Sequence, residues 1–254
     1  MRSEKSGFLL LPYSWLVLCS GCADTGSQCD GAVFADPTES IVESFFDQDE
    51  YEDALAGFSC LLTVDFEDVE VSGSDPVAIE SDRYLASHFV RIEGDGSQYV
   101  HTDFGLPNDF PEAPSGSNLF APGPIAEGSD PGGFETSVTF VRDDTIAGVA
   151  AFSVIFVDAD RPEQGESGIA VMGRSGSVLA EEVGFSGDNA SQIFLGFVAR
   201  DADGRPGPAI VEVEITSGSE WVGLNEDEDV ALDDLSFLEP IPRETGGLQG
   251  SGNR

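Results

Sequence analysis

Histidine is scarce in this chain, and that scarcity limits the chemistry it can do. Only His88 and His101 are present, so a Ser-His-Asp group would have to use one of these two side chains. The sequence contains no G-x-S-x-G elbow, H-E-x-x-H helix, P-loop or G-x-G-x-x-G turn. It also lacks the His and Cys spacing that is typical of a transition-metal site. We therefore expect a protein that is not an enzyme.

Carboxylates are the other side chains able to do chemistry, and they are abundant. Paired Asp or Glu residues hydrolyse glycosidic bonds when they flank the scissile bond. Because the chain has 48 acidic residues, such pairs arise readily by chance. The E-x-D-x-x-E strand motif of laminarinase-like sandwich hydrolases is missing. A secreted sandwich-fold hydrolase acting on polysaccharide is therefore the alternative interpretation.

The charge balance excludes one class of partner. The chain carries 11 Lys and Arg residues against 48 Asp and Glu residues, a net charge of −37. A surface of this sign repels the phosphates of nucleic acid, so we expect no nucleic-acid partner. A solvated acidic coat, screened by salt, explains the charge without any specific acidic function.

The beginning of the chain resembles an export signal. Arg2 and Lys5 precede the apolar run Phe8–Leu18. This run is too short to cross a hydrocarbon core of roughly 30 Å as a helix, so it suits a cleaved segment better than an anchor. Residues 1–21 are therefore expected to be a signal peptide.

The residues at the cleavage point indicate how the protein is held. The sequence Cys19-Ser20-Gly21-Cys22 resembles the bacterial lipoprotein cleavage box, which implies a lipid on Cys22. The protein is then anchored to a membrane of the cell envelope, at the outer membrane or the cell surface. The alternative is an ordinary secretory signal and a secreted or periplasmic protein.

Two further cysteines, Cys29 and Cys60, follow the expected cleavage point. An oxidising envelope permits one disulfide between them, which would tie the N-terminal segment to the start of the fold. The alternative is two unpaired thiols.

Residues 22–60 are expected to form a tether and a short helical pre-region. The acidic stretch 36–58 reads as a helix that ends at Gly57. Its expected apolar face consists of three side chains, Ile41, Phe45 and Phe46.

Residues 61–239 have the pattern of a β domain. Alternation in 208–215 indicates a strand with one buried face, and the apolar run 146–158 indicates a central buried strand. Gly94-Asp95-Gly96 predicts a hairpin between its flanking strands. Because no crossover helices separate the strands, we predict an all-β fold, an antiparallel β-sandwich or jelly roll. Residues 240–254 are expected to be a flexible tail.

Four short motifs carry a family resemblance. They are TVDFED (63–68), GSNLF (116–120), DADG (201–204) and VALDDLSF (230–237). Together they resemble the carbohydrate-binding-module-like, galactose-binding-like jelly-roll domains of exported bacterial proteins. The resemblance covers about residues 61–239 and implies that the first and last strands lie side by side.

The resemblance also implies a structural Ca²⁺ ion, with Glu67 and Asp233 or Asp234 as ligands. Asp65 and Glu67 are two residues apart and so would share one face of a strand. Carboxylates brought together from the first and last strands repel unless a cation lies between them, and calcium prefers oxygen ligands. The alternative is that these acids are solvated edge residues.

Aromatic side chains suitable for stacking on a sugar are few. Trp221 and Tyr99 are the candidates for ligand contact, although a packing role in the core or at a sheet edge suits Trp221 better. The sequence thus predicts a non-catalytic cell-envelope lipoprotein whose jelly-roll domain binds or scaffolds, with extracellular polysaccharide as the candidate ligand.

Overall fold

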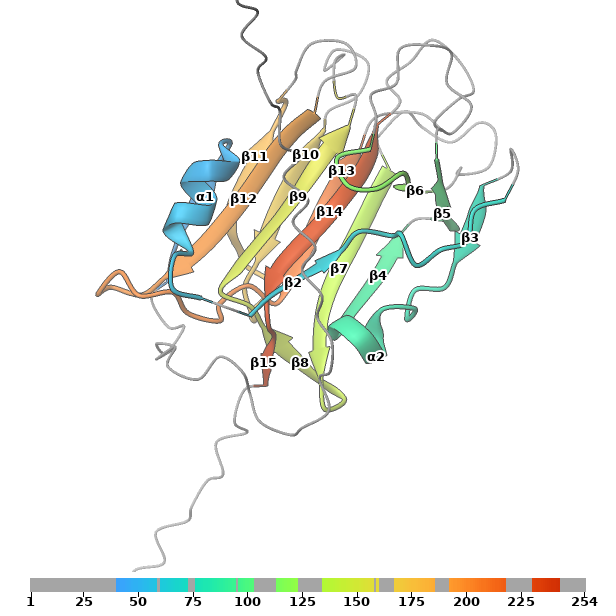
Figure 1. The fold of residues 1–254 in the computed structure, drawn as a ribbon. Helices are drawn as coiled ribbons and strands as arrows, with labels where there is room; N and C mark the ends of the chain where they lie inside the picture. The colour runs from blue at the N-terminus through green and yellow to red at the C-terminus, as the bar shows by residue number, and fades with distance from the viewer. Residues whose placement is uncertain are drawn as a thin grey trace, which may run out of the picture.

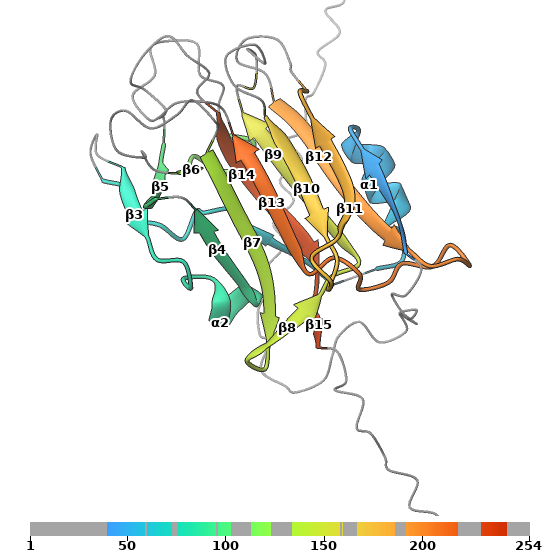
Figure 2. The ribbon, with the colours of Figure 1, turned by 180° about the vertical axis from the view of Figure 1, so that it is seen from behind.

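The protein folds as a β-sandwich. The computed structural model describes residues 40–58, 60–72, 76–94, 96–102, 113–122, 134–157, 159, 167–185, 192–217 and 230–242. Within these ranges the strands form two antiparallel sheets that pack face to face (Figures 1 and 2). This arrangement confirms the predicted all-β, antiparallel sandwich. No helix in the described ranges is long and apolar enough to cross a membrane.

The first sheet faces the viewer in Figure 1. Its strands, in spatial order, are β1 (Ile41–Phe45), β12 (Gln192–Arg200), β9 (Ala151–Val157), β14 (Ala231–Leu238), β6 (Leu119–Pro122), β5 (Gln98–His101) and β3 (Val77–Ile79). β2 (Leu61–Val64) also pairs with β14. The expected pairing of the first and last strands of the 61–239 region is therefore present.

The second sheet faces the viewer in Figure 2. Its strands are β11 (Val178–Val183), β10 (Gly168–Met172), β13 (Glu212–Ser217), β7 (Phe134–Arg142), β8 (Thr145–Gly148) and β15 (Ile241–Pro242), and β4 (Val90–Gly94) pairs with β7. Two short helices, α1 (Gln48–Ala54) and α2 (Leu85–His88), lie on opposite sides of the sandwich (Figures 1 and 2).

The core lies between the sheets and is rich in phenylalanine. Phe140 of the second sheet contacts Phe152 and Phe237 of the first, with ring centroids 6.2 and 5.1 Å apart. Every residue of β9 is buried, which confirms the prediction of a central strand. On β13 the alternation also holds, because Val213 is buried while Glu214 is exposed.

The prediction of one helix over residues 36–58 is wrong for the first part of this stretch. Ile41–Phe45 is a strand paired with β12, and only Gln48–Ala54 is helical. The Asp47 side chain caps α1 by accepting the Glu50 backbone N–H at 3.0 Å. The helix also ends at Ala54, before Gly57. The β-sandwich therefore begins before residue 61, because pairing with β12 outweighs the local helical spacing.

Two further strand predictions are wrong in detail. The strands that flank Gly94 and Gly96 do not form a hairpin, because β4 pairs with β7 while β5 pairs with β3 and β6 in the other sheet. The run 146–158 is not one strand, because the chain leaves the second sheet after Gly148 and enters the first at Ala151. A Cβ on Gly148 would lie 2.2 Å from the Pro208 carbonyl oxygen, so this crossing requires glycine.

The structure also tests where the expected C-terminal tail begins and whether Cys60 forms a disulfide. Ile241–Pro242 pairs with β8, so the expected tail from residue 240 begins at least three residues too early. Cys60 is disulfide-bonded. Cys29 lies outside the described residues, as does the lipid-anchor candidate Cys22, so the pairing of Cys29 with Cys60 stays a prediction.

Candidate functional site

The predicted calcium ligands meet where two strands share one edge of β14. β2 pairs with the C-terminal half of β14, where Leu235 lies opposite Val64. β6 pairs with the N-terminal half, where Leu232 lies opposite Phe120. Between these pairs β14 bulges and Asp234 adopts a left-handed backbone conformation, with φ of 48°. We call the acids around this gap the acid junction: Asp65, Glu67, Asp68, Asp233 and Asp234.

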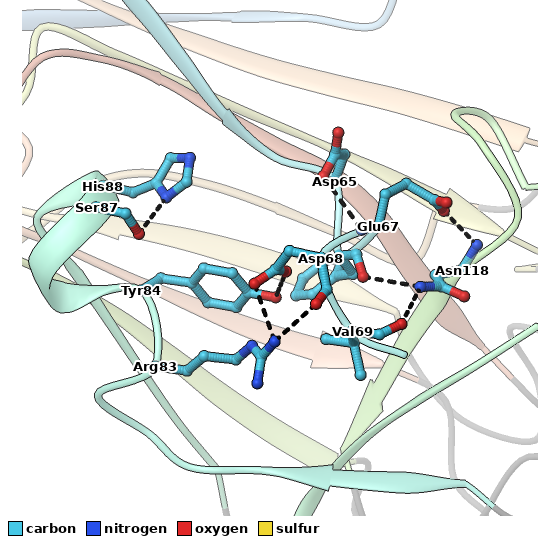
Figure 3. Close-up of polar contacts among 10 residues, drawn as sticks. Asp65, Glu67, Asp68, Val69, Arg83, Tyr84, Ser87, His88 and Asn118 are labelled. Carbon is cyan, nitrogen blue, oxygen red and sulfur yellow. Dashed lines mark hydrogen bonds and ion pairs between the residues drawn. The ribbon is translucent and has the colours of Figure 1, made fainter. Parts of the chain in front are cut away.

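A tight turn after β2 forms one wall of the acid junction. β2 ends at Val64, and the next residues do not continue the strand alternation that was expected of Asp65 and Glu67. Phe66 takes a left-handed φ of 58° and is fully buried. The buried Asn118 side chain donates to the carbonyl oxygens of Phe66 and Val69, at 2.9 and 3.0 Å (Figure 3). Asn118 thus holds a backbone conformation that is costly for phenylalanine.

Glu67 ties this turn to the segment before β6. Its Oε1 accepts the backbone N–H groups of Ser117 and Asn118, at 2.7 and 2.6 Å. Gly116 lies beneath the carboxylate with φ of 55°, and a Cβ there would come within 2.2 Å of Glu67 Cδ. Glu67 therefore acts as an anchor between two segments that are distant in sequence.

Asp233 is the fully buried acid of the acid junction. Its Oδ2 accepts the Ser115 backbone N–H at 3.0 Å, and its Oδ1 accepts the Asp234 backbone N–H at 2.8 Å. Burial raises the pKa of Asp233 to about 7, with a further rise from the Asp234 charge and an opposing effect from the backbone N–H donors. Burial also raises the pKa of Asp234, and the negative charges of Asp65 and Glu67 raise it further.

These contacts bear on the predicted calcium ion. The structure does bring Asp234 close enough for its charge to interact with that of Asp233 and with that of Glu67. However, Glu67 and Asp233 already accept backbone N–H groups. In the described part of the chain, no three His, Cys, Asp or Glu side chains form a group that could hold a metal ion. Calcium binding at these residues therefore stays a prediction.

On the side of the acid junction that faces α2, the polar side chains also have hydrogen-bond partners. Asp68 accepts the Tyr84 hydroxyl at 2.8 Å and the Arg83 guanidinium at 3.0 Å (Figure 3). His88 Nδ1 lies 2.9 Å from the Ser87 hydroxyl, and the Thr63 backbone also hydrogen-bonds to its ring. Burial lowers the pKa of His88. The acid junction as a whole therefore has the character of a structural clamp.

A groove opens beside the acid junction on the outer face of the first sheet. Its floor is formed by β9 and β14, and its sides by α1 and β2, which lie left and right of this floor in Figure 1. Its volume is about 200 Å³, and its lining residues are Gln48, Tyr51, Glu52, Leu61, Thr63, Ser153, Ile155, Phe194, Asp234 and Ser236. Asp234 thus belongs both to the groove and to the acid junction.

Tyr51 is the most informative residue of the groove. Its ring packs over Gly196 of β12, where a Cβ would lie 2.6 Å from Tyr51 Cδ2, and stands 5.3 Å from the Phe194 ring. The side chain is 2 % exposed, and its hydroxyl makes no hydrogen bond of normal geometry with any described residue. Ser153 is the polar neighbour that faces the hydroxyl. Burial raises the pKa of Tyr51, and Ser153 opposes this rise.

The groove combines two kinds of surface. Leu61, which is 45 % exposed, and the ring of Phe194 supply apolar contact area. Hydroxyl groups line the floor, where Thr63 and Ser236 lie 2.7 Å apart. Such a combination suits a ligand with an apolar face and several hydroxyl groups.

The residues predicted to contact a ligand are placed differently. Tyr99 is half-buried on β5 and packs against the cluster of Leu119 and Ala121, to which Ile155 of the groove also belongs, but it does not line the groove. Trp221 lies outside the described residues. Tyr51 was missed, because its partner Gly196 is distant in sequence. A glycine in the interior of an apolar strand is the signal that indicates such a close approach.

The chain has little detectable similarity to known proteins. No protein-family model matches it, and no curated protein does. Among solved structures, the K3 cleaved adhesin domain of Lys-gingipain from Porphyromonas gingivalis is 13% identical, with a TM-score of 0.34, and the match covers 70% of this chain and 97% of that one. The enzymatically active domain of tailspike protein 4 of bacteriophage CBA120 is 14% identical, with a TM-score of 0.27, covering 66% of this chain and 21% of that one. Similarities this distant carry no argument about function.

Proposed function

We propose that this protein is a non-catalytic binding domain of the cell envelope that holds a carbohydrate in the groove between α1 and β2. The observation that carries this proposal is Tyr51, a buried side chain that lines the groove and whose hydroxyl has Ser153 as its polar neighbour but no hydrogen bond of good geometry among the described residues. A ligand that gives this hydroxyl a hydrogen bond of good geometry would gain about 0.5–1.5 kcal/mol.

The remaining lining residues support a sugar as the ligand. Glu52 and Asp234 provide acceptors at the rim and the Gln48 amide provides both donors and acceptors. A volume of about 200 Å³ is below the range of about 300–1,000 Å³ that is usual for small-molecule pockets. We therefore expect the groove to seat one ring of a longer polysaccharide.

The location of the protein is part of the same proposal. A lipid on Cys22 would hold the domain at the envelope, where extracellular polysaccharide is accessible. Metabolic labelling with a fatty-acid probe tests this anchor, and Cys22→Ser should abolish the label. A protein that partitions into the aqueous phase without the label would be an ordinary exported protein.

Calcium remains a separate proposal for the acid junction. If Glu67, Asp233 and Asp234 complete a site with additional oxygen ligands, added Ca²⁺ raises the melting temperature and EDTA lowers it. Equal melting temperatures under the two conditions would contradict the calcium proposal without affecting the groove.

The binding experiment uses insoluble plant, algal and peptidoglycan polymers in a pull-down, followed by a glycan array. The wild-type protein should be retained by at least one polymer, and Tyr51→Phe should weaken retention. Tyr99→Phe is the matched control, because it makes the same change on the same sheet at a residue that does not line the groove. Retention that depends on Tyr99 instead would move the site to β5, and a clean negative for all polymers would refute carbohydrate binding.

A further inference from the structure

A second cavity opens on the opposite side of the sandwich from α1, between the outermost described strands β3 and β4 (Figures 1 and 2). We call it the edge cleft. Its volume is about 370 Å³, and it is lined by Ala78, Ile79, Glu80, Ser81, Glu93, Gly94, Gly96, Ser97 and Gln98. Beside it β4 is joined to the turn after β3, because the Ile92 backbone N–H donates to the Ser81 carbonyl oxygen at 3.0 Å.

Gln98 gives the edge cleft its chemical character. Its side chain is 4 % exposed, yet Oε1 is buried and accepts no hydrogen bond from any residue that the structure describes. A buried amide oxygen in this state is rare in folded proteins, and it usually indicates a bound water or ligand.

Gly94 makes room for this side chain. A Cβ at Gly94 would lie 3.2 Å from Gln98 Nε2 and 3.1 Å from the Glu135 carbonyl oxygen. Gln98 belongs to the first sheet and Gly94 to the second, so the amide fills the space between the two sheet edges. The site is therefore built into the fold and does not depend on exposed residues alone.

The lining residues are strongly biased towards hydrogen-bond acceptors. Glu80 and Glu93 bring two carboxylates, Ser81 and Ser97 bring hydroxyls, and Gln98 brings its Oε1. Among the described lining residues there is no Lys, no Arg and no aromatic side chain. We propose that the edge cleft is a second binding site, for a primary ammonium compound of monosaccharide size that also carries hydroxyl groups, such as a hexosamine.

Two features favour an organic cation over a metal ion or a neutral sugar. A divalent metal ion prefers more oxygen ligands of charged type, and the described residues contain no group of three metal-binding side chains. A neutral sugar could donate hydroxyl groups to the two carboxylates but would leave their negative charges unbalanced, and the cleft offers it no aromatic ring for stacking. A volume of about 370 Å³ is at the lower end of the range for small-molecule sites.

The test measures binding of glucosamine and N-acetylglucosamine to the full chain by calorimetry at low salt. Acetylation of the amino group removes the positive charge and keeps the ring and all of its hydroxyl groups. Glucosamine should bind saturably and N-acetylglucosamine about tenfold more weakly or not at all. Gln98→Leu should weaken glucosamine binding about tenfold, because the unpaired acceptor is lost. Glu93→Gln should weaken it up to about fivefold, as expected for an exposed charge.

Two control variants separate binding in the edge cleft from general charge attraction and from binding in the groove. Glu181→Gln removes one carboxylate from β11, at the edge of the second sheet that lies opposite β4. This variant should keep the dissociation constant for glucosamine within about twofold of wild type. Tyr51→Phe should also leave it unchanged, so failure here and failure of the groove proposal are distinguishable. Absence of saturable binding, equal binding of both sugars, or equal effects of Glu181→Gln and Glu93→Gln would overturn the proposal. If Gln98→Leu impairs folding, Glu80→Gln and Glu93→Gln carry the test.

Discussion

The acid junction and the groove lie side by side and share Asp234, yet their polar groups are in opposite states. In the acid junction, Glu67 and Asp233 each accept backbone N–H groups, and Asn118 satisfies two carbonyl oxygens. In the groove, the buried Tyr51 hydroxyl makes no normal hydrogen bond with a described residue. Satisfied polar groups hold a fold together, whereas buried unsatisfied ones mark places where a ligand or water belongs. We therefore assign structure to the acid junction and binding to the groove.

The largest expected effect is on stability, at the acid junction. Asn118→Ala removes the side-chain donor from the Phe66 and Val69 carbonyl oxygens, of which Phe66 keeps the Val69 backbone N–H at 3.1 Å, and it releases the left-handed turn. We expect the free energy of unfolding to fall by about 2–5 kcal/mol. Asn118→Asp should be at least as destabilising, because its carboxylate faces the same two carbonyl oxygens. Urea denaturation measures both variants, and a loss below about 1 kcal/mol would contradict the structural role.

The second prediction concerns pH and Asp233. The pKa of Asp233 rises from 3.8 to about 7 on folding. The folded state then binds a proton that the unfolded state releases between these values, so this group stabilises at low pH and the stabilisation is lost as pH rises towards 7. The effect is at most about 4 kcal/mol.

Asp233→Asn should remove this component, measured as the difference between the variant and wild type across the same pH range. His88 contributes with the opposite sign, because its pKa is lowered and its stabilisation is lost as the pH falls below 6.5. The His88 contribution is present in both the variant and the wild type, so it cancels in the difference between them. Asp201→Asn is the control, because the pKa of Asp201 is lowered by its bonds to Arg205. An unchanged pH dependence in Asp233→Asn would refute the assignment.

A smaller effect is expected where α1 meets β12. Gly196→Ala places a Cβ within 2.6 Å of the Tyr51 ring, so the ring must shift and α1 with it. We expect a loss of about 1–3 kcal/mol and a weakened groove ligand. Gly168→Ala is the control, since its new Cβ meets Val183 Cγ1 at 3.1 Å, the end of a side chain. Equal effects in the two variants would remove the special role of Gly196.

Burial explains which strands could be predicted from the sequence. The alternation around Val213 and the apolar run of β9 predict strands correctly, because burial of one or both faces leaves a direct mark on residue type. Ile41 and Phe45 are four residues apart, which fits a helix, but pairing with β12 places them in a strand. The spacing of residues within 41–45 gives no information about β12, which lies far away in the sequence.

The candidate site was predictable only in part. The motifs around Glu67 and Asp233 correctly indicate that the strand before Glu67, β2, and the strand that contains Asp233, β14, lie side by side. The expected strand alternation at Asp65 and Glu67 is wrong, because β2 ends at Val64. Phe66 in a left-handed conformation has no clear sequence signal. Likewise, Tyr51 over Gly196 and Gln98 beside Gly94 are contacts that only the packed sandwich creates.

The most direct test of this assignment measures stability and affinity together in Tyr51→Phe and Glu67→Gln, using the polymer that retains the wild-type protein. Tyr51→Phe should keep the free energy of unfolding within about 0.5 kcal/mol of wild type and weaken binding about tenfold. Glu67→Gln should lower stability by about 1–3 kcal/mol, because two charge-assisted hydrogen bonds are weakened, and leave the affinity of the folded protein unchanged. If Glu67→Gln weakens binding and Tyr51→Phe does not, the acid junction is the binding site and the assignment is reversed.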